Sequence, residues 1–428
     1  MLDLENINKV HFIGIGGIGV SAISRMMLQK DKIVSGSDID ESEITKALEE
    51  EGAKIFDKHS AENLADDTDL VVYTVAIDSD NPEFVKAKEL GIETKTYSQM
   101  LGSISDGYYT VAVAGTHGKT TTTAMLAKVA VDAELSPTVI VGSLLKDSGS
   151  NLIVGDRDLF IVEACEYKRS FLDLKPNILV ITNIDEDHLD YYKDLADIQN
   201  AFTELVSKLG EDNFLVCNPN DEKIKPVIKN AKCKIVDYTK VENIKDLKVE
   251  GVYNLENAKA AFAVLEILKV KKQKAISSLQ EFESVWRRFE YKGTAINGAE
   301  VYDDYAHHPT EIRAALRAAR EKFPNQEIII AFQPHLYSRT KLLLNDMAQS
   351  FKDADDILVA PIYAAREKND PNISSQILAE EIKKNGSNAR AYSDFSEIEQ
   401  YLKDNTQKSD IIITMGAGDI YKIAENLI

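Results

Sequence analysis

Residues 110–123 read Thr-Val-Ala-Val-Ala-Gly-Thr-His-Gly-Lys-Thr-Thr-Thr-Thr, a short apolar run followed at once by a glycine-rich turn. A phosphate-binding loop needs glycines that let the backbone approach the ligand, a lysine for the outer phosphates and a hydroxyl for Mg²⁺. Gly118, Lys119 and Thr120 supply these groups, and Gly115 begins a loop that is shorter than usual. The stretch predicts an ATP site after a strand; a turn that needs glycine only for its shape is the structural alternative.

Similar runs recur along the chain, each followed by a turn and a helical pattern. They are residues 10–13, 159–162, 178–181, 328–332 and 411–414. Runs that are apolar at every position, rather than alternating, are typical of parallel strands covered by helices on both faces. The sequence therefore predicts an α/β fold, and 428 residues suggest about three domains.

Composition excludes several classes of function. Fifty basic and 70 acidic side chains give a net charge of −20, which disfavours general nucleic-acid binding. Three irregularly spaced cysteines make neither a disulfide framework nor a cysteine zinc site. Residues 1–6 lack the basic start of a signal peptide, and no apolar run approaches the roughly 18 residues of a membrane span. We therefore expect a cytoplasmic protein without membrane insertion.

A second glycine loop, Gly14-Ile-Gly-Gly-Ile-Gly19, follows the first apolar run and precedes a helical pattern. In this context, glycines allow backbone N–H groups and a helix N-terminus to approach a diphosphate. Asp38 ends the next strand, where an acid can bind a ribose. The loop predicts a nucleotide site for NAD or another diphosphate-bearing ligand, with a tight packing turn as the alternative.

Acids and histidines follow several of the other apolar runs. Glu163 ends one run, and Asp185, Asp187 and His188 follow another. Because the carboxyl ends of parallel strands share one sheet edge, these groups are candidate Mg²⁺ ligands beside Lys119, although each alone is more often a solvated loop residue.

The C-terminal third carries two further candidate segments. Residues 303–311 join a strand to a helix whose first turn would contain Pro309, and residues 332–340 place His335 and Arg339 after another strand. Arginine suits the recognition of carboxylate or phosphate. Caps and packing residues are the alternative for Asp304, Thr310 and the histidines of the first segment.

Taken together, these segments resemble the Mur ligases. The motifs that carry the resemblance are Gly115-Thr-His-Gly-Lys-Thr-Thr121, Glu163-Ala-Cys-Glu166, Thr182-Asn-Ile-Asp-Glu-Asp-His188, Arg287-Arg-Phe289, Asp303-Asp-Tyr-Ala-His-His-Pro309 and Phe332-Gln-Pro-His335. The last of these, with its Ser-Arg-Thr continuation, favours the alanine-adding type over the tripeptide-recycling type. The resemblance implies an ATP-dependent ligase in peptidoglycan precursor synthesis that joins L-alanine to the lactyl carboxylate of UDP-N-acetylmuramate, through an acyl phosphate and a tetrahedral intermediate.

The same resemblance implies three domains and a monomer or weak homodimer. Residues 1–104 would form a Rossmann-like domain for the UDP-sugar, residues 105–285 a central P-loop ATPase-type domain with a parallel sheet, and residues 286–428 a Rossmann-like ligase domain.

The resemblance also assigns site residues, with ATP and Mg²⁺ as cofactors. The catalytic residues would be Lys119, His188, His335 and Arg339. ATP would be bound by Gly115, Thr116, His117, Gly118, Lys119, Thr120, Thr121, Asn257, Arg288 and Asp304. The UDP-sugar would be bound by Gly14, Gly16, Gly17, Gly19, Ser37 and Asp38, and the metal by Thr120, Glu163 and His188.

Two other hypotheses fit parts of the sequence. An NAD-linked oxidoreductase would explain the first glycine loop and Asp38, but not the second loop or the acids. A non-catalytic, nucleotide-gated regulator would keep the fold and lose the chemistry; the presence of four residues argues against it, namely Lys119, Thr120, Glu163 and His188.

Overall fold

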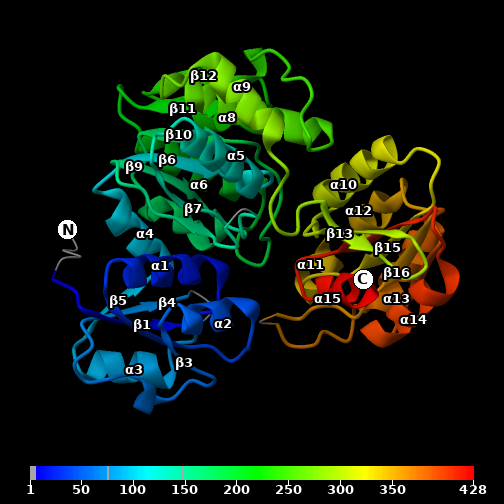
Figure 1. Ribbon diagram of the computed structural model, residues 1–428, viewed down its shortest axis with the longest axis horizontal. Coiled ribbons are helices and arrows are strands. Elements are labelled where there is room, and N and C mark those ends of the chain that lie inside the picture. The colour runs from blue at the N-terminus through cyan, green and yellow to red at the C-terminus, as the bar shows by residue number, and fades with distance from the viewer. Residues whose placement is uncertain (1–5, 75–76, 147, 366) are drawn as a thin grey trace. The chain divides into compact units, whose positions relative to one another are not determined.

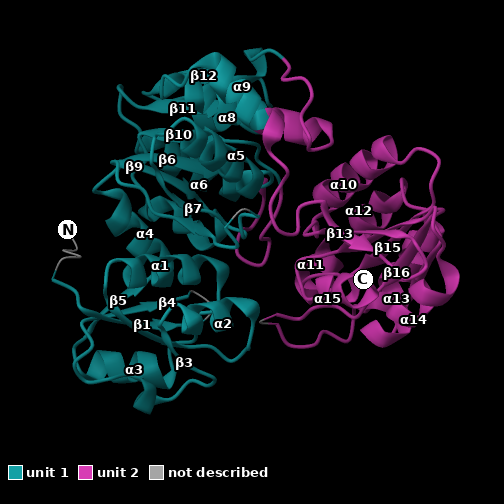
Figure 2. Ribbon diagram, viewed as in Figure 1, with its two compact units in different colours: residues 1–185, 196–242, 258–279 teal, residues 186–195, 243–257, 280–428 magenta. Residues whose placement is uncertain are grey.

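The computed structural model describes residues 6–74, 77–146, 148–365 and 367–428 (Figure 1). Residues 1–5, on which the expectation about a signal peptide depends, lie outside these ranges. The chain divides into two compact units, coloured separately in Figure 2. The first comprises residues 1–185, 196–242 and 258–279; the second comprises residues 186–195, 243–257 and 280–428. Three mostly parallel sheets confirm the predicted α/β class.

The first sheet has five parallel strands in the order β3-β2-β1-β4-β5. Its strands are β1 (Lys9–Ile13), β2 (Ile33–Ser37), β3 (Lys54–Phe56), β4 (Leu70–Tyr73) and β5 (Glu93–Thr96). Its helices are α1 (Ile18–Gln29), α2 (Glu43–Glu50), α3 (Pro82–Glu89) and α4 (Tyr97–Ser105). The strand order reverses between β1 and β4, so ligands are expected at the carboxyl ends of these strands, where the first glycine loop begins.

The second sheet has seven strands in the order β12-β11-β10-β6-β9-β7-β8, of which only the pair β7 and β8 is antiparallel among the described residues. The strands are β6 (Tyr109–Ala114), β7 (Thr138–Ile140), β8 (Leu152–Ile153), β9 (Leu159–Glu163), β10 (Ile178–Ile181), β11 (Phe214–Cys217) and β12 (Lys234–Asp237). The helices are α5 (Lys119–Asp132), α6 (Leu195–Ser207), α7 (Lys225–Ile228), α8 (Val252–Ile267) and α9 (Lys272–Glu281). Strand β6 lies between β10 and β9, so the phosphate-loop candidate starts at the centre of the sheet.

The third sheet has the order β13-β14-β18-β15-β16-β17, with only β13 antiparallel to its neighbour in the described chain. The strands are β13 (Glu290–Thr294), β14 (Glu300–Asp304), β15 (Ile328–Phe332), β16 (Asp356–Val359), β17 (Ala389–Ala391) and β18 (Ile411–Met415). The helices are α10 (Pro309–Lys322), α11 (Tyr337–Leu342), α12 (Leu344–Ala348), α13 (Ser375–Lys384), α14 (Phe395–Asn405) and α15 (Tyr421–Leu427). Helix α10 begins at Pro309, as predicted.

Strand β15 shows why the apolar runs do not alternate with polar residues. Ile328 and Ile330 belong to one hydrophobic cluster, together with Leu316 of α10. Ile329 belongs to a second cluster, together with Leu402 of α14. Successive side chains point to opposite faces of a sheet, so a strand that is covered on both faces must be apolar throughout.

Short turns of 3-10 helix occur at residues 61–63, 167–173, 238–240 and 349–351. Among the described residues, none of the helices combines the length and apolar character that crossing a membrane would require.

Candidate active site

The phosphate-loop candidate has a backbone that only glycine adopts easily. Gly115 follows β6 with φ +131°, and Gly118 precedes α5 with φ +80°. A Cβ on Gly115 would lie 2.1 Å from the hydroxyl oxygen of Thr182. Both glycines are therefore required by conformation or space, and the loop delivers Lys119 to the first position of α5.

Lys119 is held inside this loop by oxygen atoms. Its Nζ donates to the carbonyl oxygens of Gly115 at 2.6 Å and Thr116 at 3.0 Å, and lies 2.9 Å from Oε2 of Glu166. Burial lowers the pKa of Lys119, but Glu166, Cys165 and Glu163 together outweigh burial, so the pKa is raised overall. The amine is therefore fully charged at neutral pH and suited to an anionic ligand.

Residues 182–185, which follow β10, form hydrogen bonds with the phosphate-loop candidate. The His117 N–H donates to Oδ1 of Asn183 at 2.9 Å, and the Thr182 hydroxyl donates to the His117 carbonyl at 2.6 Å. The Asp185 N–H donates to the Thr116 hydroxyl at 2.8 Å. Thus His117 and Thr116, expected as ATP residues, have backbone or hydroxyl groups that fix the shape of the loop.

Glu163 lies at the carboxyl end of β9, paired in register with Val113 of β6. Its Oε2 accepts the N–H of Gly142 at 2.9 Å, and a Cβ on Gly142 would lie only 2.4 Å from that oxygen. Thr120 is buried in the first turn of α5, and Thr121 follows it. A hydroxyl on α5 and a carboxylate on the adjacent strand are hard oxygen ligands of the kind that Mg²⁺ prefers.

The first glycine loop is organised by the end of β2. Gly14 has φ +79°, and the Gly16 N–H donates to Oδ2 of Asp38 at 2.8 Å. The Gly17 N–H donates to the Gly14 carbonyl at 3.2 Å, which closes the turn before α1. A Cβ on Gly19 would lie 2.5 Å from the ring of Tyr97, so this glycine is required for packing.

Ser37, expected to contact the UDP-sugar, is fully buried. Its hydroxyl donates to Oε2 of Glu83 at 2.5 Å and lies 2.8 Å from Nδ1 of His59. The structure therefore directs this side chain into the first sheet and its helix α3 rather than toward the glycine loop.

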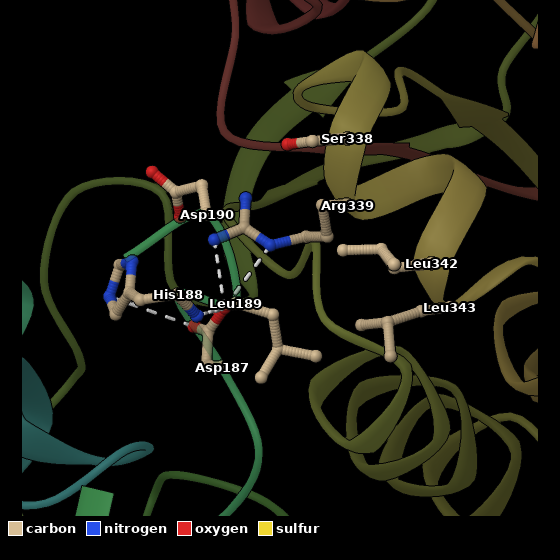
Figure 3. Close-up of a pocket in the computed structure, with 8 residues that line it drawn as sticks. All are labelled: Asp187, His188, Leu189, Asp190, Ser338, Arg339, Leu342 and Leu343. Carbon is tan, nitrogen blue, oxygen red and sulfur yellow. Dashed lines mark hydrogen bonds and ion pairs between the residues drawn. The ribbon is translucent and has the colours of Figure 1, made fainter. Parts of the chain in front are cut away.

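In the second unit, Arg339 is paired with a carboxylate that belongs to the motif ending at His188. Its Nη2 and Nε lie 2.9 Å and 3.2 Å from Oδ1 of Asp187, and both side chains are buried (Figure 3). Burial would raise the pKa of Asp187, but the charges of His188 and Arg339 hold it well below its usual range. The guanidinium therefore has a permanent counter-charge.

His335 extends this arrangement. Its Nδ1 lies 3.0 Å from Nη1 of Arg339, and its ring stacks on Tyr363 with centroids 5.6 Å apart and an interplanar angle of 18°. The His307 ring approaches the same imidazole edge-on at 5.7 Å. Burial lowers the pKa of His307 to about 4, so this imidazole is neutral at pH 7.

His188 has a positive φ of +53°, and its N–H donates to Oδ1 of Asp187 at 2.7 Å. The pocket drawn in Figure 3 is lined by a set of residues from two segments of the second unit, namely Asp187, His188, Leu189, Asp190, Ser338, Arg339, Leu342 and Leu343. The motif ending at His188 and the motif around Arg339 are therefore neighbours in the structure.

The expected nucleotide residues of the second unit form another group. Asp304 accepts the N–H groups of Phe289 and Ala306, both at 2.7 Å, and burial raises its pKa to about 6. Arg288 lies over the Tyr305 ring at 5.2 Å and interacts electrostatically with Asp304. Asn257 contacts Asn254 through their amides, at 3.4 Å.

The sequence reasoning missed one partner in each unit. No role was predicted for Glu166, yet it pairs with Lys119, and its position three residues after Glu163 was the available signal. Asp187 was considered as a metal ligand, whereas here its carboxylate holds Arg339. No sequence signal connects Asp187 with Arg339, because these two residues are 152 positions apart.

Family models match nearly the whole chain. Residues 9–109 match the model described as the Mur ligase family catalytic domain, residues 113–279 the Mur ligase middle domain, and residues 287–418 the Mur ligase glutamate ligase domain. The three matches follow the three sheets in order.

Curated relatives match over almost their full length. The chain is 44% identical to a UDP-N-acetylmuramate–L-alanine ligase of Clostridium botulinum, covering 99% of this chain and 98% of the relative. It is 42% identical to a protein of the same name from Acetivibrio thermocellus, covering 99% and 96%.

Solved structures also match this chain over almost its full length. A UDP-N-acetylmuramate–alanine ligase from Thermotoga maritima superposes with a TM-score of 0.83 at 30% identity, covering 98% of both chains. A murein peptide ligase from Psychrobacter arcticus gives a TM-score of 0.75 at 22% identity over the same coverage, which shows the shared fold.

Proposed function

The chain belongs to the Mur ligase family, and we propose that within this family it is the enzyme that joins L-alanine to UDP-N-acetylmuramate. The observation that carries the proposal is 44% identity spread over 99% of the chain to a ligase of that name. An NAD-linked oxidoreductase has no support from these comparisons. The product would be a precursor of peptidoglycan.

We assign the three sheets to three domains, with residues 1–104 for the UDP-sugar, 105–285 for ATP and 286–428 for the closing ligase domain. The order of the family matches and of the sheets supports this division. Residues 186–195 and 243–257 lie within the central stretch of sequence but belong to the second compact unit. These two segments thus carry His188 and Asn257 into the unit that holds Arg339.

The first chemical step must turn a poor leaving group into a good one. An amine does not displace an oxygen from a carboxylate, so the γ-phosphoryl group of ATP is first transferred to the lactyl carboxylate, which gives an acyl phosphate and ADP. Charge builds up on the phosphoryl oxygens during this transfer. Lys119, charged and held at the start of α5, would stabilise that charge, and the loop glycines would admit the phosphates.

The residues at the ends of β9 and α5 fit Mg²⁺. Thr120 and Glu163 offer a hydroxyl and a carboxylate on adjacent elements, and Oε2 of Glu163 accepts the Gly142 N–H. We assign a first Mg²⁺ to Thr120 and Glu163 and a second to His188. When bound, the metal would supply positive charge that stabilises the negative charge of the phosphates.

In the second step, the amine of L-alanine attacks the acyl carbon. A tetrahedral intermediate forms, the C–O bond to phosphate breaks, and the amine loses a proton as the amide forms. Arg339, whose guanidinium suits a carboxylate, would orient the incoming amino acid or the reacting carboxyl group, with His335 beside it. Asn257 and Arg288 would contact the base or phosphates of ATP, and Asp304 its ribose.

A phosphate-release assay tests this function. ATP is supplied with UDP-N-acetylmuramate alone, with L-alanine alone and with both, and phosphate is measured in each case. Release that requires both substrates supports the ligase. Release without dependence on both refutes it, and an absence of release while ATP still binds would favour a nucleotide-gated regulator.

A further inference from the structure

Glu83 is a buried carboxylate that the proposed chemistry leaves unexplained. It is the second residue of α3, and its side chain is 0% exposed. Oε2 accepts the Ser37 hydroxyl at 2.5 Å, and Oε1 accepts the Asn63 amide at 2.6 Å and the Ser60 N–H at 3.2 Å. Both oxygens are therefore occupied by donors from two parts of the first sheet domain, the end of β2 and the turn at residues 60–63.

Two histidine rings border the same carboxylate. His11 Nε2 lies 3.4 Å and His59 Nδ1 3.7 Å from Oε2 of Glu83. Burial would raise the pKa of Glu83, but the neighbouring His11 ring and the hydrogen bonds from Ser37 and Asn63 lower it. The carboxylate is therefore ionised at neutral pH, and hydrogen bonds to an ionised acceptor are the strong ones.

Ser37 connects this carboxylate to the glycine loop. It is the last residue of β2, and its carbonyl accepts the N–H groups of Gly14 at 2.8 Å and Ile15 at 3.1 Å. The next residue, Asp38, accepts the N–H of Gly16 at 2.8 Å. Three successive loop N–H groups are bonded to residues 37 and 38, so the position of the loop follows the end of β2.

The hydrogen bonds of the glycine loop also determine which backbone N–H groups are available to bind a diphosphate. The N–H groups of residues 14–16 point to β2 and Asp38, whereas the first N–H groups of α1, which starts at Ile18, have no acceptor within the helix. A diphosphate is therefore expected at the start of α1, and the position of that helix end depends on the loop that leads into it.

We propose that Glu83 is a positioning residue for the UDP-sugar. By holding the Ser37 side chain, it fixes the carboxyl end of β2, which in turn fixes the glycine loop and the start of α1. This inference rests on the function proposed above. A buried ionised group is a weak means of stabilising a fold, whereas it is an effective means of specifying one geometry at a binding loop.

The test uses the full chain and measures phosphate release with saturating ATP and L-alanine while UDP-N-acetylmuramate is varied. Glu83→Gln keeps the shape of the side chain and removes its charge. We expect the KM for UDP-N-acetylmuramate to rise about ten-fold, while kcat and the KM for ATP stay within about two-fold. Ser37→Ala removes the hydroxyl that donates to Glu83, and it should also raise the KM for UDP-N-acetylmuramate.

Asn63→Ala is the matched control, because it removes a hydrogen bond to Glu83 without touching the Ser37 link. Its KM should stay within about two-fold of wild type. Thermal unfolding of each variant separates binding from stability, and if Glu83→Gln does not fold, the pair Ser37→Ala and Asn63→Ala carries the test.

Two results would overturn the inference. The first is an unchanged KM in Ser37→Ala or in a folded Glu83→Gln; the second is a KM in Asn63→Ala that rises as much as in Ser37→Ala, in parallel with lost stability. A wild-type enzyme that does not turn over with both substrates would instead refute the proposed function. Failure of the positioning role and failure of the function are thus distinguishable.

Discussion

The ion pair between Lys119 and Glu166 gives a quantitative prediction about nucleotide binding. The two charged groups lie 2.9 Å apart, and Glu166 is 2% exposed. At this distance, unit charges attract by about 6 kcal/mol at an effective dielectric constant of about 20. Removal of one partner from a buried pair commonly costs about 3–5 kcal/mol, because the other charge is left without compensation.

Glu166→Gln should therefore lower the free energy of unfolding by about 3 kcal/mol when no nucleotide is present. A bound triphosphate would supply the missing negative charge, so saturating ATP should restore much of this loss. In the wild type, the triphosphate must also draw Lys119 away from Glu166 and approach a buried carboxylate. We therefore expect the variant to bind a non-hydrolysable ATP analogue more tightly, by about ten-fold.

Urea unfolding with and without the analogue measures the first effect, and titration calorimetry measures the second. Glu222→Gln is the matched control, because Glu222 is 84% exposed and pairs with Lys225 on the surface of the same unit. This control should change stability by less than about 0.5 kcal/mol. A Glu166→Gln variant with wild-type stability, or with weaker binding of the analogue, would refute the reasoning.

Three other predictions concern catalysis and pH. Lys119→Ala should abolish phosphate release while the calorimetric Kd for UDP-N-acetylmuramate stays within about two-fold, and loss of both would contradict the assignment of the two ligands to different domains. Excess chelator should abolish phosphate release, and added Mg²⁺ should restore it; activity that persists in chelator would contradict the metal assignment. The pKa of His307 is about 4, below the usual 6.5, so its contribution to stability is present above pH 6.5 and is lost as pH falls toward 4. At pH 4 this loss is about 3 kcal/mol. The urea concentration at the unfolding midpoint should therefore fall less between pH 7 and pH 4 in His307→Gln than in the wild type. An equal fall in both proteins would refute this prediction.

The parts of the fold that the sequence predicted are those with local signals. An uninterrupted apolar run, a glycine that needs positive φ and a proline at the start of a helix each act within a few residues. This is why the central strand Thr110–Ala114, the loop glycines Gly115 and Gly118, and the start of α10 at Pro309 could be predicted.

The remaining parts depend on which segments meet in three dimensions. The resemblance to the Mur ligases assigned Ser37 to the UDP-sugar, but Glu83, 46 positions away, accepts its hydroxyl in the interior. The partner of Arg339 lies 152 positions away on a different motif. Pairings of this kind follow from the packing of elements that are distant in the sequence. Motifs read along one chain do not show which of these elements pack together.

Lys119 and Arg339 together show how an acidic protein can present cations to anionic substrates. Each is a positive group proposed to meet phosphate or carboxylate, and each lies 2.9 Å from a buried carboxylate, Glu166 or Asp187. A net charge of −20 would favour protonation and cation binding generally, but it does not fix the position of a particular cationic side chain. The buried acids do so by holding each side chain in one position before the substrate arrives. The cost is competition, because the substrate must offer more than the carboxylate it displaces. At Lys119, a triphosphate with several negative oxygens can do this, whereas a singly charged anion gains little, and this difference favours the triphosphate over the simple anions of the cell.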